Sequence, residues 1–258
     1  MLFRSAIAVE RLHYVEVAQQ SELQMVTERL RSSILSALSH DLRTPLTVLV
    51  GLADSIALAP AVPAPVLENA AALRDQAARL AGLVGNLLEM ARLNAGSVTL
   101  RQEWQPLEEV VGSSLKLLGA ALGRHRLHID LAPDLPLLRF DAVLIERVLC
   151  NLLENAAKYS PAAGEIRLAA ELAGDWVEIS VSDEGPGFPD LIAEQLFGMF
   201  VRGSGESAMP GTGLGLAICR AIVDAHGGRI RIENLAGRGG RVVVALPRGE
   251  PPPVEEEA

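Results

Sequence analysis

The sequence has 258 residues, of which 49% are hydrophobic, so the chain is long enough for two domains and can fill at least one full core. Aromatic residues make up only 3%, and that core must therefore be built from Leu, Val, Ile and Ala. The formal charge of -9 argues against nucleic acid as a partner, because such a surface repels phosphates.

The sequence also predicts a cytoplasmic chain that makes no membrane contact of its own. No apolar run reaches the roughly 20 residues that span a bilayer, and the apolar opening from Met1 to Val9 is too short for a signal peptide. Cys150 and Cys219 lie within apolar helical patterns, which predicts buried thiols in a reducing compartment.

The first third of the chain has a helical pattern. Apolar residues have helical spacing almost throughout residues 6–58, and the proline-rich residues 59–65 end that helix. A second segment with helical apolar spacing follows over residues 66–93. The two segments predict an antiparallel helical hairpin. Their apolar stripes are wider than one partner covers, so we expect two copies to form a dimeric four-helix bundle.

One short stretch in the first helix contains a histidine outside the apolar seam. His40 is predicted to face solvent, with Asp41 beside it. Pro45 removes a backbone donor and clashes with the carbonyl of Asp41, so the helix should bend or loosen next to the histidine. Taken alone, this stretch is typical of an ordinary solvated helix face.

After Gly96 the pattern changes to mixed helix and strand, which predicts a second domain that contains both kinds of element. Helices are expected over residues 106–122, from the N-cap Asp141 to Tyr159, and over residues 213–225. Strands are expected over residues 98–103, 127–131, 165–172, 176–181, 229–233 and 241–246. The domain boundaries predicted are a linker helix 1–30, a hairpin 31–95, an α/β domain 96–248 and a disordered acidic tail 249–258.

Three polar motifs in the second domain suggest a nucleotide site. Asn151, Asn155 and Lys158 are spaced four and three apart and share one helix face, where amide oxygens and an ammonium group suit a magnesium-bound triphosphate. A helix with an ordinary polar stripe has the same pattern. Asp183 follows a strand and precedes Gly185 and Gly187, so its carboxylate could accept the adenine amino proton, although Asp before glycines is also a common turn.

The third motif runs from Gly211 to Leu216 and opens a helix, where backbone N–H groups bind phosphate. A dinucleotide fingerprint is excluded on two counts. Leu216 occupies the position that needs the last glycine, and the residues before Gly211 have the composition of a loop instead of a strand.

In their order, these motifs resemble those of the two-component sensor histidine kinases. Ser39 to Leu46 is similar to the H box, Asn151 to Ser160 to the N box, Asp183 to Gly187 to G1, Phe197 to Phe200 to the F box, and Gly211 to Leu216 to G2. The resemblance covers about residues 25 to 247. The runs Leu38 to Val50 and Pro210 to Gly228 resemble the Kdp potassium-responsive sensor kinases in particular, whose membrane helices and sensing region have no counterpart here, so we expect the cytoplasmic kinase portion.

The resemblance implies that the second domain is an α/β sandwich that binds ATP, of the histidine kinase, gyrase and chaperone type, and it implies roles for individual residues. His40 would take the γ-phosphoryl group of ATP, Asp41 would orient the ring or accept its proton, and Thr44 would position water in dephosphorylating the partner. Asn155 would bind Mg2+, Lys158 phosphate, Tyr159 and Asp183 the adenine. The residues expected to contact the nucleotide are completed by Asn151, Gly185, Gly187, Arg202, Gly211, Thr212, Gly213, Leu214 and Gly215.

One departure separates the chain from its hydrolytic relatives. Those ATPases place a water-activating glutamate four residues before the metal-binding asparagine, and here that position is Asn151. Glu154 lies about 100° round the helix from Asn155 and faces elsewhere. Without a base for water, the site should pass phosphate to a better nucleophile.

The resemblance therefore implies a homodimeric histidine kinase that phosphorylates itself at His40 and donates to an aspartate of a response-regulator receiver domain, in potassium or osmotic signalling. Two alternatives stay open: an ATP-gated ATPase or scaffold without phosphotransfer, and a purely structural helical-bundle adaptor. Outside the motifs, His226 is predicted to stabilise a helix C-terminus as a cation, and zinc at His125 and His128 is not expected.

Overall fold

The computed structural model describes residues 42, 44–60, 62–94, 100–188, 195–198, 213–235 and 239–250. Its contacts divide the chain into two compact units, Met1–Val98 and Thr99–Ala258. Several predictions lie outside the described residues: the linker helix 1–30, the tail 251–258, and the site residues His40, Asp41, Arg202, Gly211 and Thr212.

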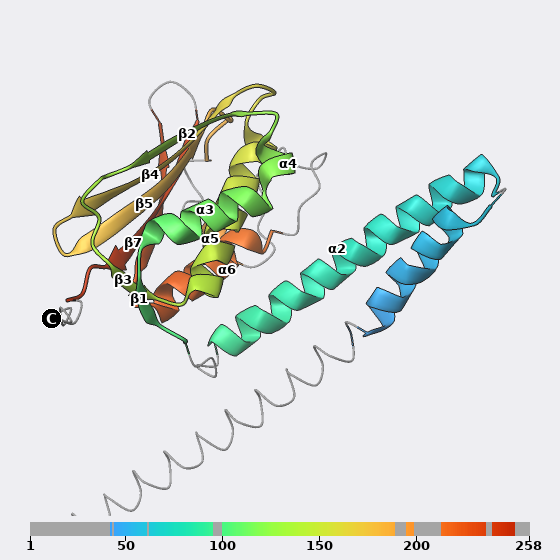
Figure 1. Cartoon of the computed structure of the whole chain (residues 1–258), viewed down its shortest axis with the longest axis horizontal. Helices are drawn as coiled ribbons and strands as arrows, with labels where there is room; N and C mark the ends of the chain where they lie inside the picture. Colours follow the sequence, from blue (N-terminus) through green and yellow to red (C-terminus); the bar gives the residue numbers. More distant parts are fainter. Residues whose placement is uncertain are drawn as a thin grey trace, which may run out of the picture. The chain divides into compact units, whose positions relative to one another are not determined.

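The first unit contains the predicted helical hairpin. Residues 44–58, including Pro45, are helical, and after the proline-rich turn α2 (Ala64–Asn94) runs back beside them, as Figure 1 shows. Among its described residues the hairpin buries Ala53, Ala70 and Ala77, each at most 4% exposed, and Leu88 at 5%. The alanines let the two helices approach closely, whereas large apolar side chains such as Leu52 and Leu80 are exposed.

The second unit is a five-stranded sheet in the order β2-β4-β5-β7-β6. β2 pairs with β4 in parallel and the other neighbours pair antiparallel. The strands are β2 (Arg126–Leu131), β4 (Glu165–Ala173), β5 (Trp176–Asp183), β6 (Arg229–Asn234) and β7 (Gly240–Pro247). A separate antiparallel pair is formed by β1 (Glu103–Gln105) and β3 (Leu138–Phe140).

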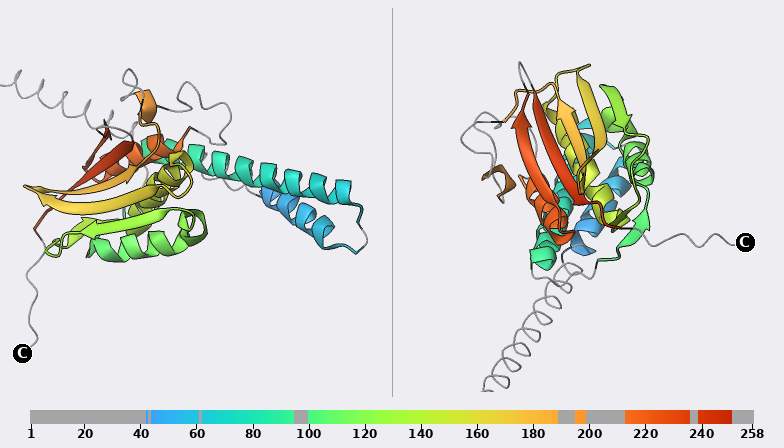
Figure 2. Two further views of the ribbon diagram at one scale, coloured as in Figure 1. Left: turned by 90° about the horizontal axis from the view of Figure 1, so that it is seen from above. Right: turned by 90° about the vertical axis from the view of Figure 1, so that its left-hand side faces the viewer.

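Helices cover one face of this sheet, which gives the predicted α/β sandwich (Figures 1 and 2). α5 (Ala142–Tyr159) packs between α3 (Leu107–Leu117) and α6 (Gly215–Ala225) and contacts β5. The short α4 (Gly119–Leu122) and the 3-10 turn η1 (Gln195–Phe197) complete the helical layer. Alternate residues of the strands face these helices and form the core. In the central strands these residues are Ile166, Leu168, Val177, Ile179, Val181, Val242 and Val244.

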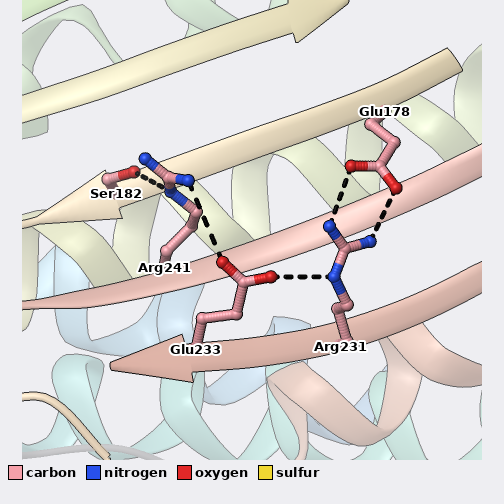
Figure 3. A network of polar contacts seen from close by, with 5 residues as sticks. All are labelled: Glu178, Ser182, Arg231, Glu233 and Arg241. Atoms are coloured by element: carbon pink, nitrogen blue, oxygen red, sulfur yellow. Dashed lines mark hydrogen bonds and ion pairs between the residues drawn. The ribbon is translucent and has the colours of Figure 1, made fainter. Parts of the chain in front are cut away.

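A network of ion pairs stabilises part of the opposite, solvent-facing side of the sheet (Figure 3). Arg231 on β6 donates two hydrogen bonds of 2.8 Å to the carboxylate of Glu178 on β5 and one of 2.8 Å to Glu233. Arg241 on β7 donates to Ser182 at 3.2 Å and lies 3.9 Å from Glu233. Residues from three neighbouring strands are thereby joined across the sheet.

Two predictions about the elements are wrong in detail. The strand expected over residues 98–103 is found at Glu103–Gln105, where β1 pairs with β3, a strand that was not predicted. The helix expected over residues 106–122 is split at Leu118, whose ψ of 6° ends α3 before Gly119 begins α4. Glycine at this point favours the break because it is a poor helix former.

His226 is not the helix-capping cation that the sequence suggested. Its ring is 6% exposed, its Nε2 atom accepts the backbone N–H of Asp141 at 3.1 Å, and its Nδ1 atom lies 2.7 Å from the carbonyl oxygen of Ile222. Both contacts are satisfied only by the neutral ring with its proton on Nδ1. The contact with Asp141, far away in the sequence, determines the state of this ring.

Candidate nucleotide site

The polar face of α5 forms one wall of the candidate site. The helix begins at the N-cap Asp141, whose side chain accepts the N–H of Leu144 at 3.3 Å, and its apolar face buries Leu152, Leu153 and Ala156. Asn151, Asn155 and Lys158 are half-buried on the remaining surface. The helix therefore presents amides and an ammonium group on the face predicted from their spacing.

At the end of α5, Lys158 and Tyr159 interact with each other. The Lys158 Nζ atom donates to the Tyr159 hydroxyl at 2.7 Å and lies 4.3 Å from the centre of its ring. A hydrogen bond combined with a cation–π contact fixes both side chains at the C-terminal end of the helix.

The turn after β5 forms the second wall. The Asp183 carboxylate accepts the N–H of Gly185 at 2.7 Å, and a backbone hydrogen bond from Gly240 reaches the same carboxylate. Burial raises the pKa of the Asp183 carboxyl above its usual value, although the two backbone hydrogen bonds oppose this shift. A half-buried carboxylate held by backbone donors has a fixed direction, which suits the recognition of a hydrogen-bond donor.

Gly185 brings this turn into contact with the end of α5. A Cβ atom at Gly185 would lie 2.8 Å from the carbonyl oxygen of Tyr159 and 2.6 Å from Oδ1 of Asp183. Gly187, with a φ of +77°, adopts a backbone conformation that other residues rarely adopt. Glycine at position 185 therefore lets the turn pass against the helix, and glycine at position 187 lets the turn adopt its backbone conformation.

The start of α6 forms the third wall. Leu214 is fully buried and anchors the segment, and Gly215 begins the helix. A Cβ atom at Gly215 would lie 3.6 Å from Nδ2 of Asn155. The amide of Asn155 thus lies close to the first turn of α6, so the described parts of the three motifs meet although they are far apart in the sequence.

The residues present fit a nucleotide. The Nδ2 atom of Asn151 is buried and has no hydrogen-bond partner among the described residues, and Asn155, Lys158 and Asp183 supply amide, ammonium and carboxylate groups that suit a nucleotide. Among the described residues no group of three or more His, Cys, Asp or Glu side chains could hold a metal by itself. Mg2+ that enters with a triphosphate needs few protein ligands, and the amide oxygen of Asn155 is the candidate.

Asn151 also faces α6. Its side chain is close enough to the Cys219 thiol to lower the pKa of that thiol, but complete burial outweighs this and raises the pKa to about 12. Cys219 is therefore an inert buried thiol, as predicted, whereas Cys150 is only half-buried.

The remaining predicted residues are distributed as follows. Phe197 of the F box is 8% exposed, and the guanidinium of Arg220 on α6 lies 5.4 Å from its ring centre. Thr44 belongs to the other unit, where it is exposed on the first helix. Sequence reasoning missed Asn234 at the end of β6, whose side chain hydrogen-bonds to the backbone of Phe188 just after the Asp183 turn.

The sequence and the fold match known proteins. Residues 30–96 match the His Kinase A (phospho-acceptor) domain, and residues 140–250 match the histidine kinase-, DNA gyrase B-, and HSP90-like ATPase. The structure resembles the crystal structure of full-length ShkA in complex with AMPPNP, with a TM-score of 0.72 and 28% identity over 83% of this chain and 45% of that one.

Two of the relatives in sequence are both sensor proteins named KdpD. The chain is 44% identical to the sensor protein KdpD of Escherichia coli over 97% of its own length and 28% of that protein. It is 35% identical to KdpD of Mycobacterium tuberculosis over 97% of its length and 30% of that protein. The chain thus spans less than a third of these relatives, and among its described residues no helix is long and apolar enough to cross a bilayer. With a phospho-acceptor domain followed by an ATPase domain, the chain belongs to the sensor histidine kinases.

Proposed function

We propose that this chain is the kinase portion of a two-component sensor that phosphorylates itself at His40 from Mg-ATP and then donates to an aspartate of a response-regulator receiver domain. A ring nitrogen of His40 attacks the γ-phosphorus, the bond from that phosphorus to the bridging oxygen breaks, and ADP leaves. Asp41 orients the ring or takes its proton. Bound Mg2+ would neutralise phosphate charge beside Asn155.

The observation that carries this proposal is the close approach of the three motifs. Gly185 brings the Asp183 turn against Tyr159, and Gly215 brings the start of α6 to Asn155. A base reader, an amide for the metal and a glycine-rich helix start therefore surround one position. Lys158 would contact the phosphate groups. Arg202, Gly211 and Thr212, which are not among the described residues, would contact the nucleotide as well.

The site contains no evident base for hydrolysis among its described residues. The position four residues before Asn155 is Asn151, a neutral amide, and Glu154 is exposed on another face of α5. A site of this kind holds ATP without activating water, and supplies the γ-phosphoryl group to an imidazole instead.

The exposed apolar surface of the hairpin supports a homodimer. Leu52, Leu58 and Leu80 are 55%, 86% and 50% exposed, while the interior of the hairpin is filled mainly by alanines. Leaving these leucines in water is unfavourable, because each buried side chain of this size contributes about 1.5–3 kcal/mol. A second hairpin would cover them and complete a four-helix bundle.

The stimulus that we propose rests on the similarity to the relatives. Potassium or osmotic signalling is supported by the similarity to KdpD proteins. Thr44, exposed on the first helix, would position water if the kinase also dephosphorylates its regulator. The domain limits that we propose for these activities are 31–95 for dimerisation and phosphotransfer and 96–248 for ATP binding.

Incubation with γ-labelled ATP and Mg2+ tests the proposal. Acid-labile label should appear on the chain, should be absent from His40→Ala, and should move to an added receiver domain. Label that persists in His40→Ala would overturn the assignment. An ATP-gated ATPase would instead release phosphate at a rate indifferent to His40, and a structural adaptor would show no thermal shift with nucleotide.

A further inference from the structure

The side chain of Asn234 makes two hydrogen bonds to the backbone of one residue. Its Oδ1 atom accepts the N–H of Phe188 at 2.6 Å, and its Nδ2 atom donates to the carbonyl oxygen of Phe188 at 2.7 Å. Phe188 directly follows the turn that begins at Asp183. The amide therefore binds the end of this turn in the way that a neighbouring strand would.

The position of Asn234 is itself determined by the hairpin of β6 and β7. Asn234 is opposite Gly240 in the register of the two strands, and Leu235 donates its N–H to the carbonyl oxygen of Gly239 at 3.0 Å. Asn234 is the last residue of β6, so the sheet holds its backbone while its side chain extends toward Phe188.

The same end of the hairpin contacts the beginning of the turn. A Cβ atom at Gly239 would lie 2.0 Å from the carbonyl oxygen of Asp183, and one at Gly240 would lie 2.7 Å from the ring of Phe188. The backbone of Gly240 also hydrogen-bonds to the Asp183 carboxylate. The hairpin therefore contacts both ends of the segment from Asp183 to Phe188.

We propose that Asn234 is a positioning residue for base recognition: it holds the turn after β5 so that the Asp183 carboxylate points at the base of the nucleotide. The inference rests on the proposed function, because it assigns Asp183 to the base. Asn234 itself acts only through the backbone of Phe188 and is not placed against the nucleotide.

Two substitutions at Asn234 test the contribution of these hydrogen bonds. Asn234→Ala removes both. Asn234→Asp keeps an acceptor for the Phe188 N–H but places a carboxylate oxygen against the Phe188 carbonyl, which repels it. Both variants should release the turn, and both should keep the fold because the side chain lies at the end of a strand.

Titration calorimetry of the full chain with AMPPNP and with the guanine analogue GMPPNP tests the inference. Both variants should bind AMPPNP about tenfold more weakly, which corresponds to about 1.4 kcal/mol of binding free energy. They should also lose much of the preference for adenine over guanine, and the KM for ATP should rise while kcat at saturating ATP stays unchanged. A loss of packing alone would not change base preference.

Arg229→Ala is the matched control. Arg229 lies at the opposite end of β6, where its guanidinium is 4.5 Å from the ring centre of Trp176, so this variant also loses a side-chain contact of the strand. It should retain the wild-type affinity and base preference. If both Asn234 variants bind AMPPNP with the affinity of the wild type and keep its base preference, the inference is overturned but the proposed function stands. A wild-type chain that binds no nucleotide would refute both.

Discussion

The ring of His226 connects the C-terminal end of α6 with the N-terminal end of α5, since its Nε2 atom accepts the backbone N–H of Asp141 at 3.1 Å. Asp141 is at the same time the N-cap of α5 and accepts the N–H of Arg101 at 3.0 Å. One buried ring and one capping residue therefore hold together both helices that form walls of the candidate site.

Removal of the ring should destabilise this connection. His226→Ala leaves the N–H of Asp141 without its acceptor and should lower the free energy of unfolding by about 2 kcal/mol. His226→Gln supplies another acceptor and should lose less. Urea unfolding of the two variants and the wild type measures the difference. Equal losses in Ala and Gln would show that the hydrogen bond contributes little.

A substitution at the closely packed Gly239 should weaken nucleotide binding more than a substitution at a glycine that has only a positive φ. In Gly239→Ala the new methyl group would meet the carbonyl oxygen of Asp183 at 2.0 Å, and φ at this position is +115°. The displaced turn should weaken AMPPNP binding at least about tenfold.

Gly174 provides the matched control for this prediction. It also has a positive φ, +64°, but a Cβ atom there would meet nothing within 4 Å. Gly174→Ala should therefore cost about 1 kcal/mol of stability and leave AMPPNP affinity unchanged. Equal affinities of the Gly239 and Gly174 variants would contradict the tight contact between the hairpin and the turn.

The half-buried carboxylate of Asp183 should lower the stability of the fold at neutral pH while it strengthens nucleotide binding. Its pKa is raised by burial above the ordinary 3.8, so the folded chain binds this proton more tightly than the unfolded chain does. The stability that this group contributes is greatest below pH 3.8 and falls as the pH rises through the raised pKa. Asp183→Asn removes this loss, because a neutral amide keeps an acceptor for Gly185.

At neutral pH, Asp183→Asn should therefore melt at the wild-type temperature or above it, yet bind ATP much more weakly, because its amide no longer supplies the charged acceptor for the adenine amino group. Thermal melting with and without AMPPNP checks both effects. A variant that keeps the full nucleotide-dependent shift would exclude Asp183 as the base reader.

The stability contributed by the ion pair between Glu178 and Arg231 should have the opposite pH dependence. The hydrogen bonds from Arg231 are the main cause that lowers the pKa of Glu178 below 4.5. Its contribution is present above pH 4.5 and is lost as the pH falls through the lowered pKa. Because both side chains are partly exposed, Arg231→Met should cost only about 0.5–1 kcal/mol at pH 7 and less at pH 3. Urea unfolding at both pH values measures this, and a loss that grows on acidification would contradict it.

The elements with strong local signals were predictable from the sequence. α5 follows from its apolar spacing and the N-cap Asp141, and the β4–β5 hairpin follows from alternation on either side of Gly174. β3 was missed because a strand of three residues has too few positions to show alternation, and only its pairing with β1 defines it.

The site was predictable only in its local parts. Asn155, Asp183 and Gly215 belong to motifs that can be recognised in the sequence, and the structure shows how closely their elements approach. Asn234 contacts Phe188 across 46 residues, and His226 contacts Asp141 across 85. No local pattern indicates such contacts, so the helix-dipole interpretation of His226 was overruled by tertiary packing.

The most direct test of the account measures where the γ-phosphoryl group goes. Wild type and His40→Ala are incubated with γ-labelled ATP and Mg2+, and protein-bound acid-labile label and free phosphate are counted in the same samples over time. We expect the wild type to accumulate label at His40 with little free phosphate, and His40→Ala to produce neither. Steady release of free phosphate at equal rates from both proteins, without label on the chain, would contradict it.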